Sequence, residues 1–281
     1  MKSTLLPRAA RLAARLGAVM PHDFDLAPAD EEIDVVIPVI EKDLGILPLC
    51  LEGVRRQTTN RIGGCYLVAP PTERLQAFAE AEGLALVPEN EVLGYGAADI
   101  DYRPQGRNRA GWIFQQLLKL SGRVGRAEHF LVIDADHILL RPHTFLAADG
   151  RTVLYRSEER YVPYYRKLTE LTGLAYRSPL SYVAHKMLFA RTHLAALRDL
   201  IARRKGMPWD SAILASLDRD EVSCFSEYET YGTFLPREAK RHLPWRNRTL
   251  PYGALRPYDE LVRRYAGYHR ALTFPEWFNR V

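Results

Sequence analysis

Apolar and polar positions form alternating blocks along the first half of the chain. Short apolar runs at 33–39, 65–69 and 84–88 are typical of buried strands, and the first is rich in β-branched residues. Between them, 43–56 and 72–82 carry apolar residues at helical spacing. The order strand, helix, strand, helix, strand predicts an α/β fold built on a Rossmann-type, doubly wound and mainly parallel sheet.

After a further predicted helix at 112–120, the segment 129–140 reads HFLVIDADHILL. Its first apolar run is typical of a strand that is buried on both faces. Asp134 and Asp136 then follow one residue apart, where two ionised carboxylates repel each other and are costly to desolvate. A divalent cation between them removes that cost. The pattern therefore predicts a site for Mn²⁺ or Mg²⁺ at the end of a central strand.

The Asp-x-Asp pattern is weak by itself, because the chain contains four copies. The pairs Asp23/Asp25, Asp99/Asp101 and Asp218/Asp220 close no apolar run, and we interpret them as solvated loop or cap residues. For Asp134 and Asp136 a purely structural turn is the alternative, since aspartate favours the turns that follow strands.

Composition and charge narrow the class of protein. The chain has 281 residues, is 47% hydrophobic and contains no run approaching the roughly 18 apolar residues of a membrane span. Its three cysteines have no CxxC spacing, so we expect a reducing, cytoplasmic location. The net charge is +5, and the basic excess lies at the two ends. Basic ends predict an anionic ligand or peripheral contact with the inner membrane face; solubility alone is the alternative. No nucleic-acid motif appears, so no nucleic-acid partner is expected.

These features divide the chain into three parts. Residues 1–32 are predicted to form a basic N-terminal helix, at 3–20, and an acidic linker. Residues 33–236 are predicted to form the main α/β domain, whose C-terminal half is irregular and rich in tyrosine and which we expect to be the catalytic domain. Residues 237–281 form a basic C-terminal extension that packs on the domain.

Between about residues 33 and 234 the chain resembles GT-A-fold glycosyltransferases, in particular a bacterial GT-A-like group of poorly defined specificity. The resemblance rests on four segments: IDVVIPVIEKD, GWIFQQLLKL, FLVIDADHILLRP and FSEYETYGTFL. It implies a metal-dependent transferase that moves a sugar from a nucleotide-sugar donor to a saccharide or lipid-linked acceptor. Surface-polysaccharide or glycolipid assembly is the implied setting.

The resemblance also implies roles for particular residues. The first strand and its loop would hold the donor through Pro38, Val39, Lys42 and Asp43. Asp134 and Ala135, at the end of the later strand, would contact the donor as well. Asp134 and Asp136 would bind Mn²⁺ or Mg²⁺, with His269 as third ligand and His242 as the next candidate. This departs from the His-x-x-Gly-x-x-Lys pattern of the glycogenin-like family.

Release of a nucleoside diphosphate requires positive charge where negative charge develops. Arg109 and Lys119 flank the helix before the metal strand and are candidates to reach the phosphates. A solvated lysine is the alternative for Lys119. Gln116 is a candidate for a hydrogen bond to the donor sugar or to the backbone, with a surface position as its alternative.

The segment from Ser226 to Gly232 supplies the second set of candidates. Ser226 and Glu229 fit a Ser-x-x-Glu capping box, which leaves Glu227 as the candidate base that takes the acceptor's proton. His185, Glu229 and Trp209 are the candidates for acceptor or sugar contacts. For His185 and Trp209 the alternatives are a core histidine and a loop anchor.

Two other functions remain open. A nucleotidyltransferase acting on sugar phosphates also builds an Asp–metal site on this type of sheet, but the loop at 38–43 lacks its usual glycines. A non-catalytic nucleotide-binding scaffold of the same fold is the second alternative.

Overall fold

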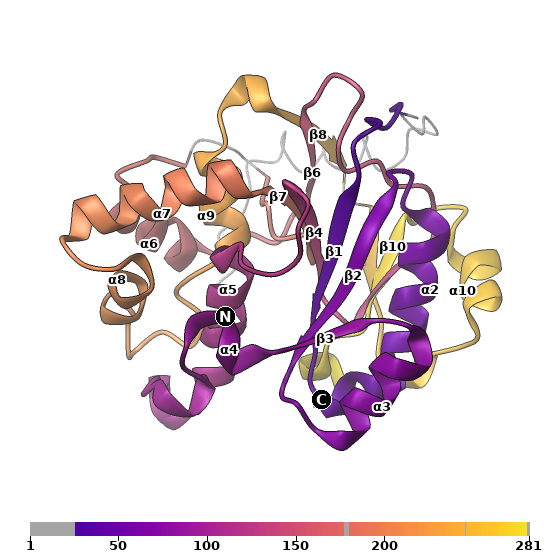
Figure 1. The fold of residues 1–281 in the computed structure, drawn as a ribbon, viewed down its shortest axis with the longest axis horizontal. Helices are drawn as coiled ribbons and strands as arrows, with labels where there is room; N and C mark the ends of the chain where they lie inside the picture. Colours follow the sequence, from indigo (N-terminus) through magenta and orange to yellow (C-terminus); the bar gives the residue numbers. More distant parts are fainter. Residues whose placement is uncertain (1–25, 177–179, 245, 280–281) are drawn as a thin grey trace.

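The computed structural model describes residues 26–176, 180–244 and 246–279, which form a mixed α/β body (Figure 1). A twisted five-stranded sheet stands between two groups of helices (Figure 1). The basic helix predicted at 3–20 lies outside the described residues. None of the helices in the described ranges has the length and apolar character needed to span a membrane.

The main sheet has the strand order β3-β2-β1-β4-β7. These strands are β1 (Ile33–Pro38), β2 (Ile62–Ala69), β3 (Ala85–Pro88), β4 (His129–Ile133) and β7 (Lys186–Ala190). β1 pairs in parallel with both β2 and β4, and β2 pairs in parallel with β3. The predicted α/β class and mainly parallel sheet are confirmed. The pattern did not predict the edge strand β7, which runs antiparallel to β4.

Helices cover both faces of this sheet (Figure 1). One face carries α2 (Leu47–Gln57) and α3 (Glu73–Glu82). The other carries α4 (Glu89–Leu93), α5 (Ala110–Ser121), α7 (Arg191–Lys205) and α9 (Glu227–Phe234). α6 (Val162–Thr172) and α8 (Trp209–Ala215) pack on α7.

Strand side chains alternate between the two faces and so build two cores. Val36 and Val132 belong to the core that also contains α5 residues. Val35 and Ile133 belong to the core on the α2 side. The same alternation directs the next even position beyond β4, residue 134, towards α5. The sheet therefore fixes which helix this carboxylate meets.

Local signals explain the ends of several helices. Gly83 and Gly122 follow α3 and α5 in left-handed conformations, with φ of 66° and 62°, which glycine adopts without steric cost. The helix predicted at 43–56 is instead a short 3-10 helix, η1 (Glu41–Gly45), followed by α2. Pro48 lies in the first turn of α2, where its missing N–H costs nothing.

Two smaller sheets connect the rest of the chain to this body. β5 (His137–Leu139) pairs with β10 (Ala271–Thr273), which pairs with β9 (Asn247–Thr249). β6 (Thr152–Arg156) pairs in parallel with β8 (Lys240–Pro244), and α10 (Tyr258–Tyr265) packs against α2. The remaining 3-10 segments are η2 (Ala97–Asp99), η3 (Pro104–Gly106), η4 (Arg237–Ala239), η5 (Tyr252–Ala254) and η6 (Glu276–Asn279).

Candidate functional site

Asp134 stands at the centre of a partly buried cluster of charged side chains. It follows β4 directly, and the strand alternation directs it towards α5. Its Oδ1 accepts hydrogen bonds from Lys119 Nζ at 2.7 Å and from the Tyr228 hydroxyl at 3.1 Å. Its Oδ2 lies 3.0 Å from His185 Nδ1. Burial raises the pKa of Asp134, but Lys119 and His185 outweigh burial and bring the pKa below its ordinary value, so this carboxylate is charged.

His185 precedes β7 and is held against Asp134 by both its ring and its backbone. Its carbonyl oxygen accepts a hydrogen bond from the Asp134 N–H at 2.9 Å. Its φ of 56° is unusual for a residue with a Cβ and is typical of functional sites. Burial lowers the pKa of His185, but its hydrogen bonds to Asp134 and Glu159 outweigh burial and raise the pKa to about 10.

Asp136 completes a group of three that could hold a metal ion. Ligand atoms of Asp134, Asp136 and His185 all lie within 4.8 Å of one another. The Asp136 Oδ1 atom is buried and has no hydrogen-bond partner among the described residues. Burial raises the pKa of Asp136 to about 6, and the charges of Asp134 and Asp43 add to this shift. An unpartnered carboxylate oxygen beside a second carboxylate and an imidazole fits Mn²⁺ or Mg²⁺, with nitrogen favouring Mn²⁺.

Lys119 lies beneath this group rather than at the surface. It is 3% exposed, and its Nζ also donates to Glu227 Oε1 at 2.8 Å. The interpretation of Lys119 as a solvated lysine is therefore wrong. Burial lowers its pKa, but Asp134 and Glu227 raise it well above the ordinary value, so the ammonium is charged.

Glu227 is the first residue of α9 and is almost fully enclosed. It is 4% exposed, and its N–H donates to Gln116 Oε1 at 3.3 Å. Gln116 thus supports the backbone of α9, and a surface position for it is excluded because it is 4% exposed. A carboxylate that is closed from solvent and paired with Lys119 is a poor acceptor of a substrate proton. The assignment of Glu227 as base remains a prediction without support from this geometry.

Half of the expected capping box forms. Ser226 Oγ accepts from the Glu229 N–H at 3.2 Å, as an N-cap residue does. The Glu229 side chain, however, turns to other donors. Its Oε1 accepts from Ser181 Oγ at 2.5 Å, from the Tyr165 hydroxyl at 3.1 Å and from the Tyr182 N–H at 3.2 Å. Burial still outweighs these bonds and raises the pKa of Glu229 to about 7.

The predicted donor loop lies at the same edge of the sheet as Asp134. Pro38 ends β1, and the Val39 N–H donates to the Val68 carbonyl at 3.0 Å. Asp43 accepts from the Ile40 N–H, and its negative charge contributes to the raised pKa of Asp136. Of the remaining predicted donor residues, Lys42 forms an ion pair with Glu276, and Ala135 packs in the core on the α2 side.

Three predicted residues find their contacts elsewhere. Arg109 donates to the Val222 carbonyl and to Ser223 Oγ, both at 3.2 Å, and lies over the ring of Trp112. Trp209 begins α8 and packs against the core on the α5 side of the sheet, with Arg198 over its ring. His269 contacts the ring of Tyr265. Among the described residues, the group of side chains that could hold a metal ion contains His185 and not His269.

Sequence reasoning did not identify two neighbours of the site. Tyr228 donates to Asp134, and Glu159 Oε2 lies 3.7 Å from His185 Nε2. Tyr228 lies between the two glutamates that the sequence did identify, so adjacency was an available signal. Glu159 belongs to an irregular loop and had no sequence signal.

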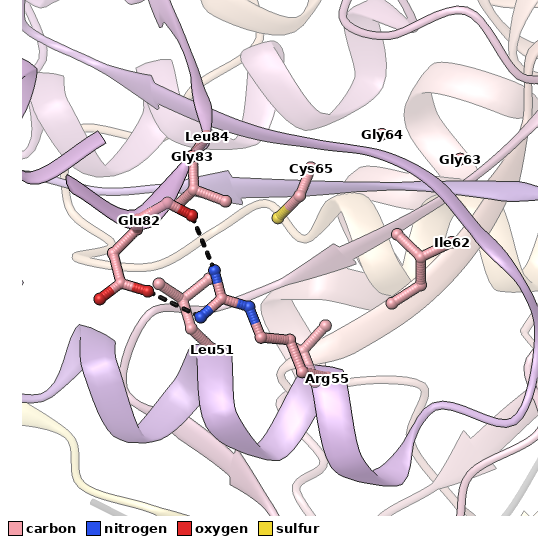
Figure 2. Close-up of a pocket in the computed structure, with 10 residues that line it drawn as sticks. Leu51, Arg55, Ile62, Gly63, Gly64, Cys65, Glu82, Gly83 and Leu84 are labelled. Atoms are coloured by element: carbon pink, nitrogen blue, oxygen red, sulfur yellow. Dashed lines mark hydrogen bonds and ion pairs between the residues drawn. The ribbon is translucent and has the colours of Figure 1, made fainter. Parts of the chain in front are cut away.

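A separate cavity of about 340 Å³ opens beside the amino end of β2 (Figure 2). Because β1 pairs in parallel with both β2 and β4, this cavity lies at the edge of the sheet opposite to Asp134. Arg55 reaches towards Glu82 there, with Nη1 2.7 Å from its carboxylate and Nη2 2.9 Å from its carbonyl oxygen (Figure 2). Burial raises the pKa of the Cys65 thiol to about 11, which keeps it protonated. None of the predicted site residues lines this cavity.

The sequence profile of a family of unknown function, DUF6492, matches residues 30–245. The chain belongs to this family. The match includes the main sheet and every residue of the Asp134 cluster. No curated protein matches the chain.

Solved glycosyltransferase structures share the arrangement of this family member only loosely. The galactosyltransferase LgtC with donor and acceptor sugar analogues is 12% identical, with 86% of this chain and 87% of LgtC covered and a TM-score of 0.44. Mouse xyloside xylosyltransferase 1 is 12% identical, with 89% and 99% covered and a TM-score of 0.47. Glucosyl-3-phosphoglycerate synthase from Mycobacterium tuberculosis is 19% identical over 38% of this chain and 34% of its own, with a TM-score of 0.25. At these TM-scores the likeness carries no argument about activity, which must come from the site.

The raised pKa of Glu229 predicts a pH-dependent stability. Because its pKa is about 7 in the folded protein against an ordinary 4.5, the folded state binds this proton more tightly. That contribution is fully present below the ordinary pKa and is lost as pH rises through 7. Glu229→Gln keeps the accepting oxygen and removes the titration. We expect its free energy of unfolding, relative to wild type, to rise by on the order of 2 kcal/mol between about pH 5 and pH 8.

Urea unfolding of both proteins at several pH values measures this difference. Glu80→Gln, on the exposed side of α3, is the matched control and should give a difference that does not change with pH. An equally flat profile for Glu229→Gln would contradict the prediction.

Proposed function

We propose that this protein is a metal-dependent glycosyltransferase that uses a nucleotide-sugar donor. The observation that carries the proposal is the Asp134, Asp136 and His185 group, with its unpartnered carboxylate oxygen, at the carboxyl edge of a parallel sheet. Ligands of open α/β sheets bind beyond this edge. The third metal ligand in the proposal is His185, in place of His269.

The charges around this edge favour a divalent cation. The charge of Asp134 raises the pKa of Asp43, and the charges of Asp134 and Asp43 raise the pKa of Asp136. The three carboxylates are therefore close enough to create one region of negative potential. Mn²⁺ or Mg²⁺ held there would bind the diphosphate of a donor and stabilise the negative charge of the departing nucleoside diphosphate. The loop from Pro38 to Asp43 lies at the same edge and would contact the nucleoside.

His185 must lose its proton before it can ligate a metal ion, because only the neutral imidazole binds. Its positive charge in the resting protein balances Asp134 and Asp136. Metal binding therefore exchanges a proton for a divalent ion at the same two carboxylates.

Asp136→Asn is the direct test of the metal site. The variant keeps the size of the side chain but removes the charge of its unpartnered oxygen, so we expect at least about a hundredfold loss of sugar transfer and of Mn²⁺ affinity. Mn²⁺ binding and release of nucleoside diphosphate from a panel of sugar nucleotides measure the two effects. Asp220→Asn, in another Asp-x-Asp pair and at an exposed position, should behave like wild type. Unchanged Mn²⁺ affinity in Asp136→Asn would refute the metal site.

A pair of histidine variants separates the two candidates for the third ligand. We expect His185→Ala to weaken Mn²⁺ binding by about 10- to 100-fold, because it removes a ligand. His269→Ala should change the affinity little, because His269 lies against Tyr265. Titration of each variant with Mn²⁺ decides between them, and the opposite ranking would return His269 to the site.

The proposed acceptor is a saccharide or a lipid-linked saccharide, presented at the inner face of the membrane in the cytoplasm. Support for a lipid surface comes from a patch around the end of α10, where Tyr265 is partly exposed and its neighbours are exposed (Arg248, Arg263, Arg264 and Tyr268). Arg248 and Arg264 lie 5.5 and 5.7 Å from the centre of the Tyr265 ring, and Tyr268 is 82% exposed. Exposed arginine beside tyrosine is typical of surfaces that contact anionic headgroups.

The arginines of this α10 patch differ from several others on the surface that are paired with acidic side chains. Within the described ranges, Arg248, Arg263 and Arg264 form no salt bridge. Elsewhere Arg61 pairs with Glu32 at 2.6 Å, and Arg74 pairs with Glu41 at 3.2 Å. Charge that is left unpaired within the protein is available to an anionic partner.

Replacing all three patch arginines with glutamine should weaken binding to vesicles that contain anionic phospholipid by at least about tenfold. Co-sedimentation at low salt measures this, with neutral vesicles as the baseline.

The matched control removes the same amount of charge elsewhere, by Arg61→Gln, Arg74→Gln and Arg103→Gln, all of which have acidic partners. If the two triple variants bind anionic vesicles equally, the patch has no specific role.

A further inference from the structure

Lys119 occupies a position that a metal ion would fill in a site with two cations. Its Nζ lies 2.7 Å from Asp134 Oδ1 and 2.8 Å from Glu227 Oε1. The Tyr228 hydroxyl lies 3.3 Å away, and the Tyr228 ring centre lies 4.7 Å away. The side chains that surround this ammonium thus present two carboxylate oxygens and a hydroxyl.

Asp134 is shared between this position and the candidate metal group. One of its oxygens faces Lys119, and the other faces His185, which forms that group together with Asp136. A carboxylate that bridges two cations is the arrangement found where enzymes bind two metal ions side by side. Here one of the two positions is already filled from within the chain.

We propose that Lys119 is a built-in second cation, which limits this site to one divalent ion. The inference rests on the proposed metal binding at Asp134, Asp136 and His185. It also gives the buried Glu227 a role, although Glu227 is not one of the proposed metal ligands. Together with Asp134, Glu227 supplies the negative charge that balances the Lys119 ammonium. Lys119 is accordingly a positioning residue that holds Asp134 and Glu227 at fixed separation.

Lys119 variants of different length and charge test this role. Lys119→Ala opens a space beside oxygens of Asp134, Glu227 and Tyr228, which are hard ligands that suit Mn²⁺. We expect this variant to bind two Mn²⁺ ions where wild type binds one. Lys119→Met fills the space with an uncharged chain of similar length. It should bind one ion at least about tenfold more tightly, because the repulsion between ammonium and metal ion is gone.

The readout is titration with Mn²⁺ alone, with free Mn²⁺ counted by electron paramagnetic resonance, so that no donor or acceptor is needed. Lys119→Arg retains the charge and should bind one ion, as wild type does. Because Lys119→Met leaves Glu227 buried without a partner, the double variant Lys119→Met/Glu227→Gln is the matched control. It removes one charge of each sign and should restore near wild-type affinity. Circular dichroism establishes that each variant is folded.

The outcomes distinguish this inference from the proposed function. If wild type binds one Mn²⁺ and the alanine and methionine variants bind one ion with unchanged affinity, the role of Lys119 is overturned and the metal site stands. Two ions in wild type would also overturn it. If wild type binds no Mn²⁺, both the inference and the metal-dependent function fail.

Discussion

The partial burial of Asp134 as a charged group is the constraint on which the rest of the site depends. A carboxylate in this position is stable only with countercharges within hydrogen-bond distance. The protein supplies two of them, Lys119 from α5 and His185 from the start of β7, at 2.7 and 3.0 Å. Each is in turn fixed by a second acid, Glu227 or Glu159. The cluster is therefore a chain of alternating charges, in which removal of Lys119 or Asp134 would leave a neighbouring charge without its partner.

The architecture explains why these side chains meet. Alternation along β4 turns Phe130 and Val132 towards α5, so the next position on that side, residue 134, reaches Lys119. Because β7 runs antiparallel to β4, its first residues lie at the carboxyl end of β4. His185 therefore arrives at the site from the beginning of a strand, whereas Asp134 arrives from the end of one. An edge strand parallel to β4 would have placed its beginning at the opposite edge of the sheet.

The sequence predicted the mainly parallel sheet and the order of its first elements, because short apolar runs and helical spacing are local signals. It also drew attention to Asp134 and Asp136, because carboxylates that close a buried run are out of place without a partner. It did not predict β7, whose pairing depends on residues more than fifty positions away. For the same reason Lys119 and His185 could be named but not given their contacts. Glu159 had no local pattern at all, and the roles of Glu227, Arg109 and Trp209 depend on distances that spacing does not encode.

The resting cluster also has a consequence for the life of the protein. Its two central carboxylates are matched by an ammonium and an imidazolium from the same chain, so the fold needs no ion to neutralise them. An ion bound at the proposed site would replace the proton on His185 and would leave the packing of the fold unchanged. Under the proposed metal dependence, scarcity of manganese or magnesium should leave folded molecules that are inactive until the ion is supplied again. Turnover of the polypeptide would be independent of metal supply, unlike that of proteins whose metals hold them together.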